Sequence, residues 1–255
     1  MATLSKPYHR LWRPMKGFIN QFERTMFRKT PSIDYLKDDL FADQTEKWSQ
    51  IISAQLILKD LYEIFNYVEP CNGNKNVYSH RIYELLLRAC TEVESNMKGI
   101  LTANGKFSRT SFTMKNDYFQ LEKACQLDKY KIKFSRWKEN VDFTPFSVWN
   151  TTAYNPLPWY QNYNEVKHDR YNNFQKANLD NLINSIAALL CLLHAQYGEE
   201  MADACQLGIS AIQNDQLKVD TETYVLEAPN FAGDEYEFDW DSIKSGLNPV
   251  DNYIF

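Results

Sequence analysis

The most apolar stretch of the chain, LINSIAALLCLLHA at 182–195, constrains the fold more than any other segment. It is shorter than the ~20 residues that a membrane-spanning helix needs. Asp180 and Asn181 stand directly before it, where a spanning helix would still be apolar. We therefore interpret this stretch as the core helix of a cytoplasmic helical bundle.

The spacing of apolar residues at three and four positions predicts five helices, over 42–67, 77–101, 114–127, 159–197 and 199–213. Pro70 follows the first helix, the pair Asn104-Gly105 should close the second, and Gly198 should end the fourth. The predicted core stripe of the first helix comprises Trp48, Ile51, Ile52, Leu56, Leu61, Ile64 and Phe65. That of the second comprises Ile82, Leu86, Ala89, Cys90, Val93, Met97 and Ile100.

Between the third and fourth helices the apolar period changes from helical to alternating. KYKIKF alternates apolar and polar residues, and VDFTPFSVW follows after a turn-like segment, so we expect a small β-hairpin at about 129–149 with Pro145 at its edge. TYVLEAPN at 223–230 is typical of a short strand. The predicted fold class is an all-α bundle with a small β-hairpin insertion and an irregular acidic C-terminal tail.

Charge divides the chain into a basic N-terminal arm at 1–40, a helical bundle at 41–213 and an acidic tail at 214–255. Seven lysines and arginines stand against one acid, Glu23, before Thr30, whereas ten acids stand against two lysines after Asn214. Two interpretations are open. The two ends pair with each other or are separately solvated, or the arm contacts RNA and the tail mimics RNA against it.

Several classes of site are disfavoured by residue spacing. The five cysteines form no CxxC pair and are interpreted as small buried hydrophobes in a reducing compartment. The four histidines lack metal-ligand spacing, and His194 is expected in the core. With eight glycines, no phosphate-binding loop and no GxSxG elbow, the chain is expected to use no cofactor and no metal.

The stretch YNEVKHDRYNNF at 163–174 places a cluster of ionisable residues just before the core helix. If the helix is continuous from Asn164, steps of 100° per residue place His168 on the core-facing stripe, with Tyr171 and Gln175 nearby. Polar groups in such a position need partners, so they should line a groove, a pocket or a subunit interface. His168 is then either a structural residue whose ring nitrogens have hydrogen-bond partners, or a titratable group that acts on a phosphodiester.

NEVKHDR at the opening of a long apolar helix, with Glu92 and Glu94 on an upstream helix, resembles the HEPN (higher eukaryotes and prokaryotes nucleotide-binding) superfamily over 41–213. The resemblance implies a homodimer, and it implies metal-independent RNase activity in toxin or antiphage systems for active members. The family signature is an Arg, four residues and a His, with a polar residue beside the Arg. His168 and Asn164 match this signature, whereas Tyr163 occupies the Arg position.

Two functions follow from this resemblance. In a ribonuclease, His168 acts as general base, Asn164 orients it or the substrate, and Lys167 and Arg170 stabilise phosphate charge. The supporting residues would be Tyr163, Tyr171, Gln175 and Glu94. The alternative is a non-catalytic dimeric module that binds a nucleotide or a protein, which Tyr163 favours because a tyrosine brings no charge. The expected partners are a second copy, RNA and a cognate regulatory protein.

Overall fold

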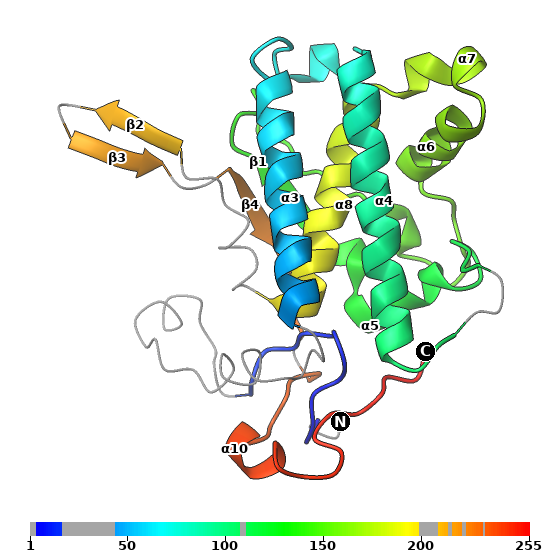
Figure 1. The fold of residues 1–255 in the computed structure, drawn as a ribbon, viewed down its shortest axis with the longest axis vertical. Helices are drawn as coiled ribbons and strands as arrows, with labels where there is room; N and C mark the ends of the chain where they lie inside the picture. Colours follow the sequence, from blue (N-terminus) through cyan, green and yellow to red (C-terminus); the bar gives the residue numbers. More distant parts are fainter. Residues whose placement is uncertain are drawn as a thin grey trace.

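The computed structural model describes residues 4–16, 44–107, 111–198, 209–213, 216–220, 223–231 and 233–255. Three long helices, α3 (Gln44–Ile64), α4 (His80–Ala103) and α8 (Leu179–Tyr197), dominate these residues. α3 and α4 lie side by side, with α8 behind them (Figure 1). The shorter helices are α5 (Leu121–Cys125), α6 (Pro158–His168), α7 (Arg170–Asn173) and α10 (Trp240–Ile243). Single 3-10 turns are η1 (Asn72–Asn74), η2 (Tyr118–Gln120), η3 (Leu127–Lys129), η4 (Ser147–Trp149) and η5 (Phe174–Lys176).

Helix α4 forms as its sequence predicts. The Ser79 hydroxyl accepts a hydrogen bond from the Ile82 N–H and caps the first turn. Every residue of the predicted stripe is buried. Asn104 caps the C-terminus, and Gly105 follows with a φ of +82°, a conformation that a glycine adopts without strain.

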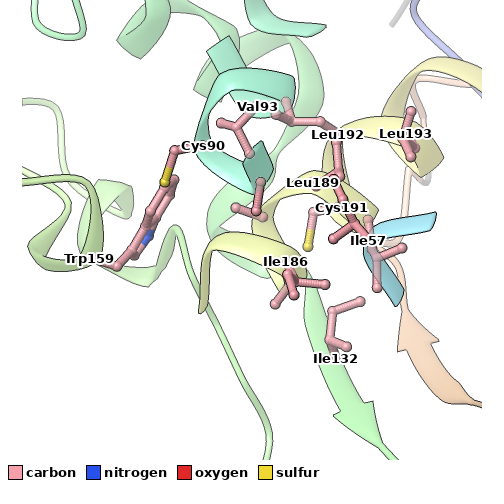
Figure 2. Packing of buried hydrophobic residues seen from close by; sticks show 14 of the residues in the cluster. Ile57, Cys90, Val93, Ile132, Trp159, Ile186, Leu189, Cys191, Leu192 and Leu193 are labelled. Carbon is pink, nitrogen blue, oxygen red and sulfur yellow. The ribbon is translucent and has the colours of Figure 1, made fainter. Parts of the chain in front are cut away.

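Helix α8 is buried on all sides. α4, α6, α3 and β1 all contact it, and buried core residues from several of these elements surround it in Figure 2. It is apolar and long enough to cross a membrane, but 89% of its most apolar window is buried in the protein, as in the core helix of a soluble protein. Gly198, with a φ of +72°, ends it and leaves room for the Trp12 indole, which a Cβ there would approach to 2.4 Å.

The prediction of one continuous helix over 159–197 is wrong. The chain breaks at Asp169, whose φ of −142° and ψ of 75° are not helical. The Asp169 carboxylate instead caps α7 by accepting from the Asn172 N–H. Asn178 caps α8 in the same way, accepting from the Asn181 N–H. Because these polar side chains bond the backbone locally, they start new helices rather than continue the old one.

The β-structure differs from the predicted hairpin. β1 (Lys131–Phe134) pairs antiparallel with β4 (Tyr224–Glu227), with Phe134 opposite Tyr224. The expected second arm contributes only a single bridge, in which Ile132 and Phe143 exchange N–H···O bonds of 3.0 and 2.8 Å. It cannot continue as a strand, because Pro145 lacks a backbone donor and the chain then turns into η4. The predicted strand in 223–230 is confirmed as β4.

The predicted fifth helix is wrong for its last part, while its first part, 199–208, lies outside the described residues. Residues 209–213 form β2 (Ile209–Gln213), which pairs with β3 (Gln216–Asp220). This second two-stranded sheet extends away from the helices in Figure 1. The predicted helix over 114–127 is shorter than expected, consisting of η2 and α5.

The two ends of the chain pair with each other, as one interpretation of the charge asymmetry predicted. Lys16 forms an ion pair with Glu237 at 2.9 Å, and Arg13 forms one with Asp234 at 2.7 Å. Arg13 is buried and also donates to the Ala124 carbonyl, so it is not available to RNA. Residues 17–40 of the basic arm lie outside the described residues.

Asn104 joins both ends to α4. Its side-chain N–H donates to the His9 carbonyl at 2.7 Å, and its side-chain oxygen accepts from the Tyr253 N–H at 2.8 Å. The side chain is buried, so water cannot readily replace these bonds.

We expect Asn104→Ala to lower the free energy of unfolding by about 2–3 kcal/mol, because two backbone groups lose their partner in a buried place. Urea unfolding followed by circular dichroism measures this change. Asn66→Ala, which removes an exposed amide, is the control. Equal stability of the two variants would show that the Asn104 bonds contribute little.

Candidate functional site

The residues predicted to form a site come from four elements. Tyr163, Asn164, Lys167 and His168 lie on α6, Arg170 and Tyr171 on α7, Gln175 on η5 and Glu94 on α4. The structure divides them into two groups. Tyr163, Lys167 and Glu94 lie close together at the contact of α6 with α4, with Asn164 beside them. The others face solvent.

The predicted inward position of His168 is wrong. His168, Tyr171 and Gln175 are all exposed, and the side chain of Tyr171 is 94% exposed. The prediction assumed that α6 continues into α8, and the break at Asp169 removes that assumption. His168 instead ends α6.

Tyr163 supports Lys167 from inside the protein. The Tyr163 side chain is only 1% exposed, and its hydroxyl accepts a 2.9 Å hydrogen bond from the Lys167 Nζ. The same Nζ lies 5.0 Å from the centre of the Tyr163 ring. This hydrogen bond raises the pKa of Lys167, and the charge of Glu94 raises it further. Tyr163 is therefore committed to Lys167 and is turned away from any solvent-borne substrate.

Glu94 is surrounded by tyrosines. The Tyr160 hydroxyl donates to a Glu94 carboxylate oxygen at 2.9 Å, and the rings of Tyr160 and Tyr163 lie 5.5 Å apart. Burial raises the pKa of Tyr160, as does the Glu94 charge, whereas a hydrogen bond with Asn164 lowers it. Burial and Glu94 also raise the pKa of Tyr118, to about 12. Burial raises the pKa of Tyr163 as well, so all three phenols stay neutral at physiological pH.

The residues that sequence reasoning missed in this group are Tyr160 and Tyr118. Tyr160 lies one helical turn before Tyr163, so the spacing of three along α6 could have indicated their contact. Tyr118 comes from η2, far away in the sequence, and no local pattern indicated it. Aromatic residues near the linker before α6 fasten it to the core. The Trp159 indole donates to the Pro145 carbonyl at 2.8 Å.

Four exposed residues, Lys167, His168, Arg170 and Tyr171, form what we call the basic corner. It lies at the turn between α6 and α7, at one end of the bundle (Figure 1). The Arg170 guanidinium lies 5.6 Å from the centre of the Tyr83 ring on α4.

Neighbouring groups hold the basic corner in place and bond two nearby acids. Phe174 contacts the rings of His80 and Tyr78 at 4.8 and 5.5 Å, which fastens the turn after α7 to the start of α4. The Asp169 carboxylate bonds Asn172, and the Glu165 carboxylate pairs with Lys176. In the described part of the chain, Lys167 and Arg170 form no ion pair with a carboxylate, although Lys167 is hydrogen-bonded to Tyr163.

The buried titratable groups are structural. His194 shares a 3.1 Å hydrogen bond with the buried Tyr130 hydroxyl, which fits the expected core position. Cys90, Cys125 and Cys191 are fully buried, and burial raises the pKa of each thiol, so they behave as small hydrophobes. Within the described ranges, no group of three His, Cys, Asp or Glu residues could hold a metal ion.

We expect Tyr163→Phe to lower the pKa of Lys167, because the variant keeps the buried ring but loses the hydroxyl that accepts the hydrogen bond of the ammonium group. NMR titration of the lysine side chains measures this change. Tyr78→Phe, which alters an exposed ring, should leave the titration unchanged. An unaltered Lys167 titration in Tyr163→Phe would show that the hydroxyl does not hold the ammonium group.

No family model matches the chain, and neither a curated protein nor a solved structure matches it.

Proposed function

We propose that this chain is a HEPN-like module that binds single-stranded RNA through the basic corner and does not cleave it as a single subunit. The observation that supports binding is the break at Asp169, which leaves Lys167, His168 and Arg170 exposed on one turn. The break leaves these basic side chains pointing outward. The HEPN-like character rests on the resemblance around His168.

The chemistry of the corner suits a nucleic-acid strand. Lysine and arginine side chains neutralise phosphates and release the counterions that surround them. Tyr171, 94% exposed, offers a flat ring on which a base can stack, and such stacking accepts any base. Arg170 rests on Tyr83, which limits the conformations that it must lose when it binds a phosphate.

The residues at the contact of α6 with α4, Tyr163 and Glu94, argue against cleavage by one subunit. In the family signature an arginine holds the phosphate, and here Tyr163 takes that position but is buried and bonded to Lys167. Glu94 accepts a hydrogen bond from Tyr160. Neither Tyr163 nor Glu94 therefore supports His168, which leaves the non-catalytic module as the better fit.

The resemblance also supports a setting for this proposal, a bacterial toxin or antiphage system with a cognate regulatory protein as partner.

We expect Lys167→Ala and Arg170→Ala each to weaken binding of a fluorescein-labelled oligo(U) by about fivefold at 0.1 M salt, since one phosphate contact is lost. The slope of log Kd against log salt should fall by about 0.7 for each removed charge. Fluorescence anisotropy at several salt concentrations gives both quantities. Lys115→Ala removes an exposed lysine elsewhere and should have no such effect. Equal affinities for all proteins would contradict a binding role for the corner.

One observation favours ribonuclease activity as a second candidate. The His168 side chain is exposed, and in the described part of the chain it has no hydrogen-bond or ion-pair partner. Lys167 and Arg170 flank it and could stabilise the charge of a phosphate. In this mechanism His168 removes the proton of a 2′-hydroxyl, whose oxygen then attacks the phosphorus and forms a 2′,3′-cyclic phosphate. The P–O5′ bond breaks, and the leaving 5′-oxygen takes a proton from water to give a 5′-hydroxyl end.

A ribonuclease would produce 2′,3′-cyclic phosphate ends from tRNA or mRNA in the presence of EDTA, because no metal takes part. Mass spectrometry of the products identifies these ends. If our proposal is correct, neither the isolated native chain nor the His168→Ala variant produces such fragments. Cyclic-phosphate fragments that disappear only in His168→Ala would instead establish the ribonuclease.

A further inference from the structure

Four rings around the start of α4 form a partly exposed cluster. We call it the aromatic strip, and its members are Tyr78, His80, Tyr83 and Phe174. Phe174 lies at its centre, with its ring 4.8 Å from that of His80, 5.5 Å from that of Tyr78 and 6.0 Å from that of Tyr83. Tyr78 is 50% exposed and His80 is exposed as well, so these two rings are open to solvent.

Residues at the start of α4 build the strip. The Ser79 side chain caps α4, so Tyr78 stands just before the helix and His80 is its first residue. Tyr83 follows His80 by three positions, which places both on one face of the helix. Phe174 reaches this face from η5.

Backbone hydrogen bonds hold this part of the chain in place. The Leu179 N–H donates to the Val77 carbonyl and the Asp180 N–H donates to the Lys75 carbonyl, each at 2.9 Å. The segment before α4 is therefore tied to the start of α8. Rings on a fixed backbone lose little freedom when a ligand stacks on them.

Packing alone does not account for the exposure of the strip. Trp159 and Tyr163, two rings that serve packing in α6, are 3% and 1% exposed. Tyr78 and His80 contact Phe174 and still keep surface in water. A flat ring with surface in water is what an unpaired base needs for stacking.

The strip adjoins the basic corner. The Arg170 guanidinium lies 5.6 Å from the centre of the Tyr83 ring, so the strip begins where the corner ends. Figure 1 shows the start of α4 and helix α7 at the same end of the bundle. Because Lys167 and Arg170 form no ion pair with a carboxylate within the described residues, their positive charges draw a polyanion toward this end.

Another exposed apolar face, on α3, lacks such charges. Trp48, Ile52 and Leu56 are 51%, 53% and 50% exposed. Sequence reasoning placed all three in the core stripe of this helix, which is wrong. The groove between α3 and α4 is rimmed by two ion pairs, Arg81 with Glu84 and Arg88 with Asp60. Because these charges balance, the groove does not attract a phosphate backbone.

We propose, on the basis of the function proposed above, that the aromatic strip stacks the unpaired bases of the RNA strand whose phosphates the basic corner binds. The strand crosses from Arg170 to the start of α4, where Tyr78 and His80 each offer a ring to one base. Paired strands keep their bases stacked inside the duplex, so the strip contributes nothing to binding them. The ligand is therefore a strand with unpaired bases, and a polyanion without bases binds more weakly.

An abasic oligomer tests whether bases are bound outside the basic corner. One fluorescein-labelled probe is oligo(U) of about ten nucleotides, and the other has the same phosphates but tetrahydrofuran units in place of the nucleosides. The chain used is Tyr171→Ala, which removes the stacking ring of the corner and alters a residue that is 94% exposed. Anisotropy should show at least about tenfold weaker binding of the abasic probe, because it has no base to stack.

Substitutions in the strip test its location. Tyr78→Ala should weaken binding of oligo(U) at least about fivefold, because one stacking ring is lost. Its affinity for the abasic probe and its slope of log Kd against log salt should stay unchanged, since no charge is lost. Tyr78→Phe keeps the ring and should bind like the native chain. The matched control is Tyr67→Ala, since Tyr67 is 82% exposed and lies outside the strip, and it should also bind like the native chain.

The outcomes separate this inference from the function on which it rests. Equal affinities of Tyr171→Ala for both probes, or of the native chain and Tyr78→Ala for oligo(U), would overturn the strip and leave the basic corner in place. A loss of affinity in Tyr78→Ala without any loss in Lys167→Ala would support base stacking and contradict the corner. A native chain that binds neither probe would overturn both.

A photo-cross-link tests the path of the strand without relying on a substitution. Oligo(U) that carries 5-iodouridine is irradiated together with the native chain, and the iodinated base joins to an aromatic side chain that is stacked on it. Mass spectrometry should find the base joined to Tyr78 or His80. Cross-links that include neither residue would contradict the proposed path even if the strand binds.

Discussion

The structure depends on the requirement to cover α8 completely. All of its residues except Asp180 and Asn184 are buried, and α3, α4, α6 and β1 each cover part of it. The polar side chains on α8 are bonded within this packing. Gln196 donates to Asn96 and accepts from Arg10, and Ser185 donates to the Leu182 carbonyl. The end of the chain that carries Arg10 is thereby part of the core.

The same requirement explains the position of the candidate site. α6 covers α8 with Tyr163 and Val166, which are buried, so Lys167 and His168 must turn toward water on the remaining side. The ammonium group of Lys167, in the last turn of α6, is also stabilised by the helix dipole. Asp169, next in sequence after His168, stabilises the start of α7. Consecutive residues thus contribute to ending one helix and starting another, and Lys167 and His168 remain exposed.

Features of the fold that depend on residues close together in the sequence could be predicted, whereas most of those that depend on distant residues could not. Helix α4 has its cap, apolar stripe and glycine within its own sequence, so its prediction was accurate. The break at Asp169 was missed because apolar periodicity was extended through residues whose side chains bond the backbone locally. The pairing of β1 with β4 joins segments far apart in the chain, and no local pattern specifies the partner of a strand. The pairing of the ends was predictable because their opposite charges were evident.

The candidate site was predicted in composition but not in arrangement. Lys167, Tyr163 and Glu94 were identified, and they do lie together. The sequence could suggest this grouping in two ways. Tyr163 and Lys167 are four residues apart on α6, and α4, which carries Glu94, packs next to α6. The orientation of His168 depended on two interruptions of the helix, at Asp169 and at Asn178, which separate α6 from α8 and leave His168 at the surface.

The distance in sequence between β1 and β4 has a consequence for synthesis of the chain. Phe134 and Tyr224 are opposite each other in the sheet, but 90 residues separate them. At about 5–20 residues per second, a ribosome needs roughly 5–18 s to make the intervening segment. Throughout that time the edge of β1 that will receive β4 has no partner from its own chain. Nascent chains on one polysome thus present unpaired strand edges to one another, and a chaperone that shields such edges would raise the yield of folded protein.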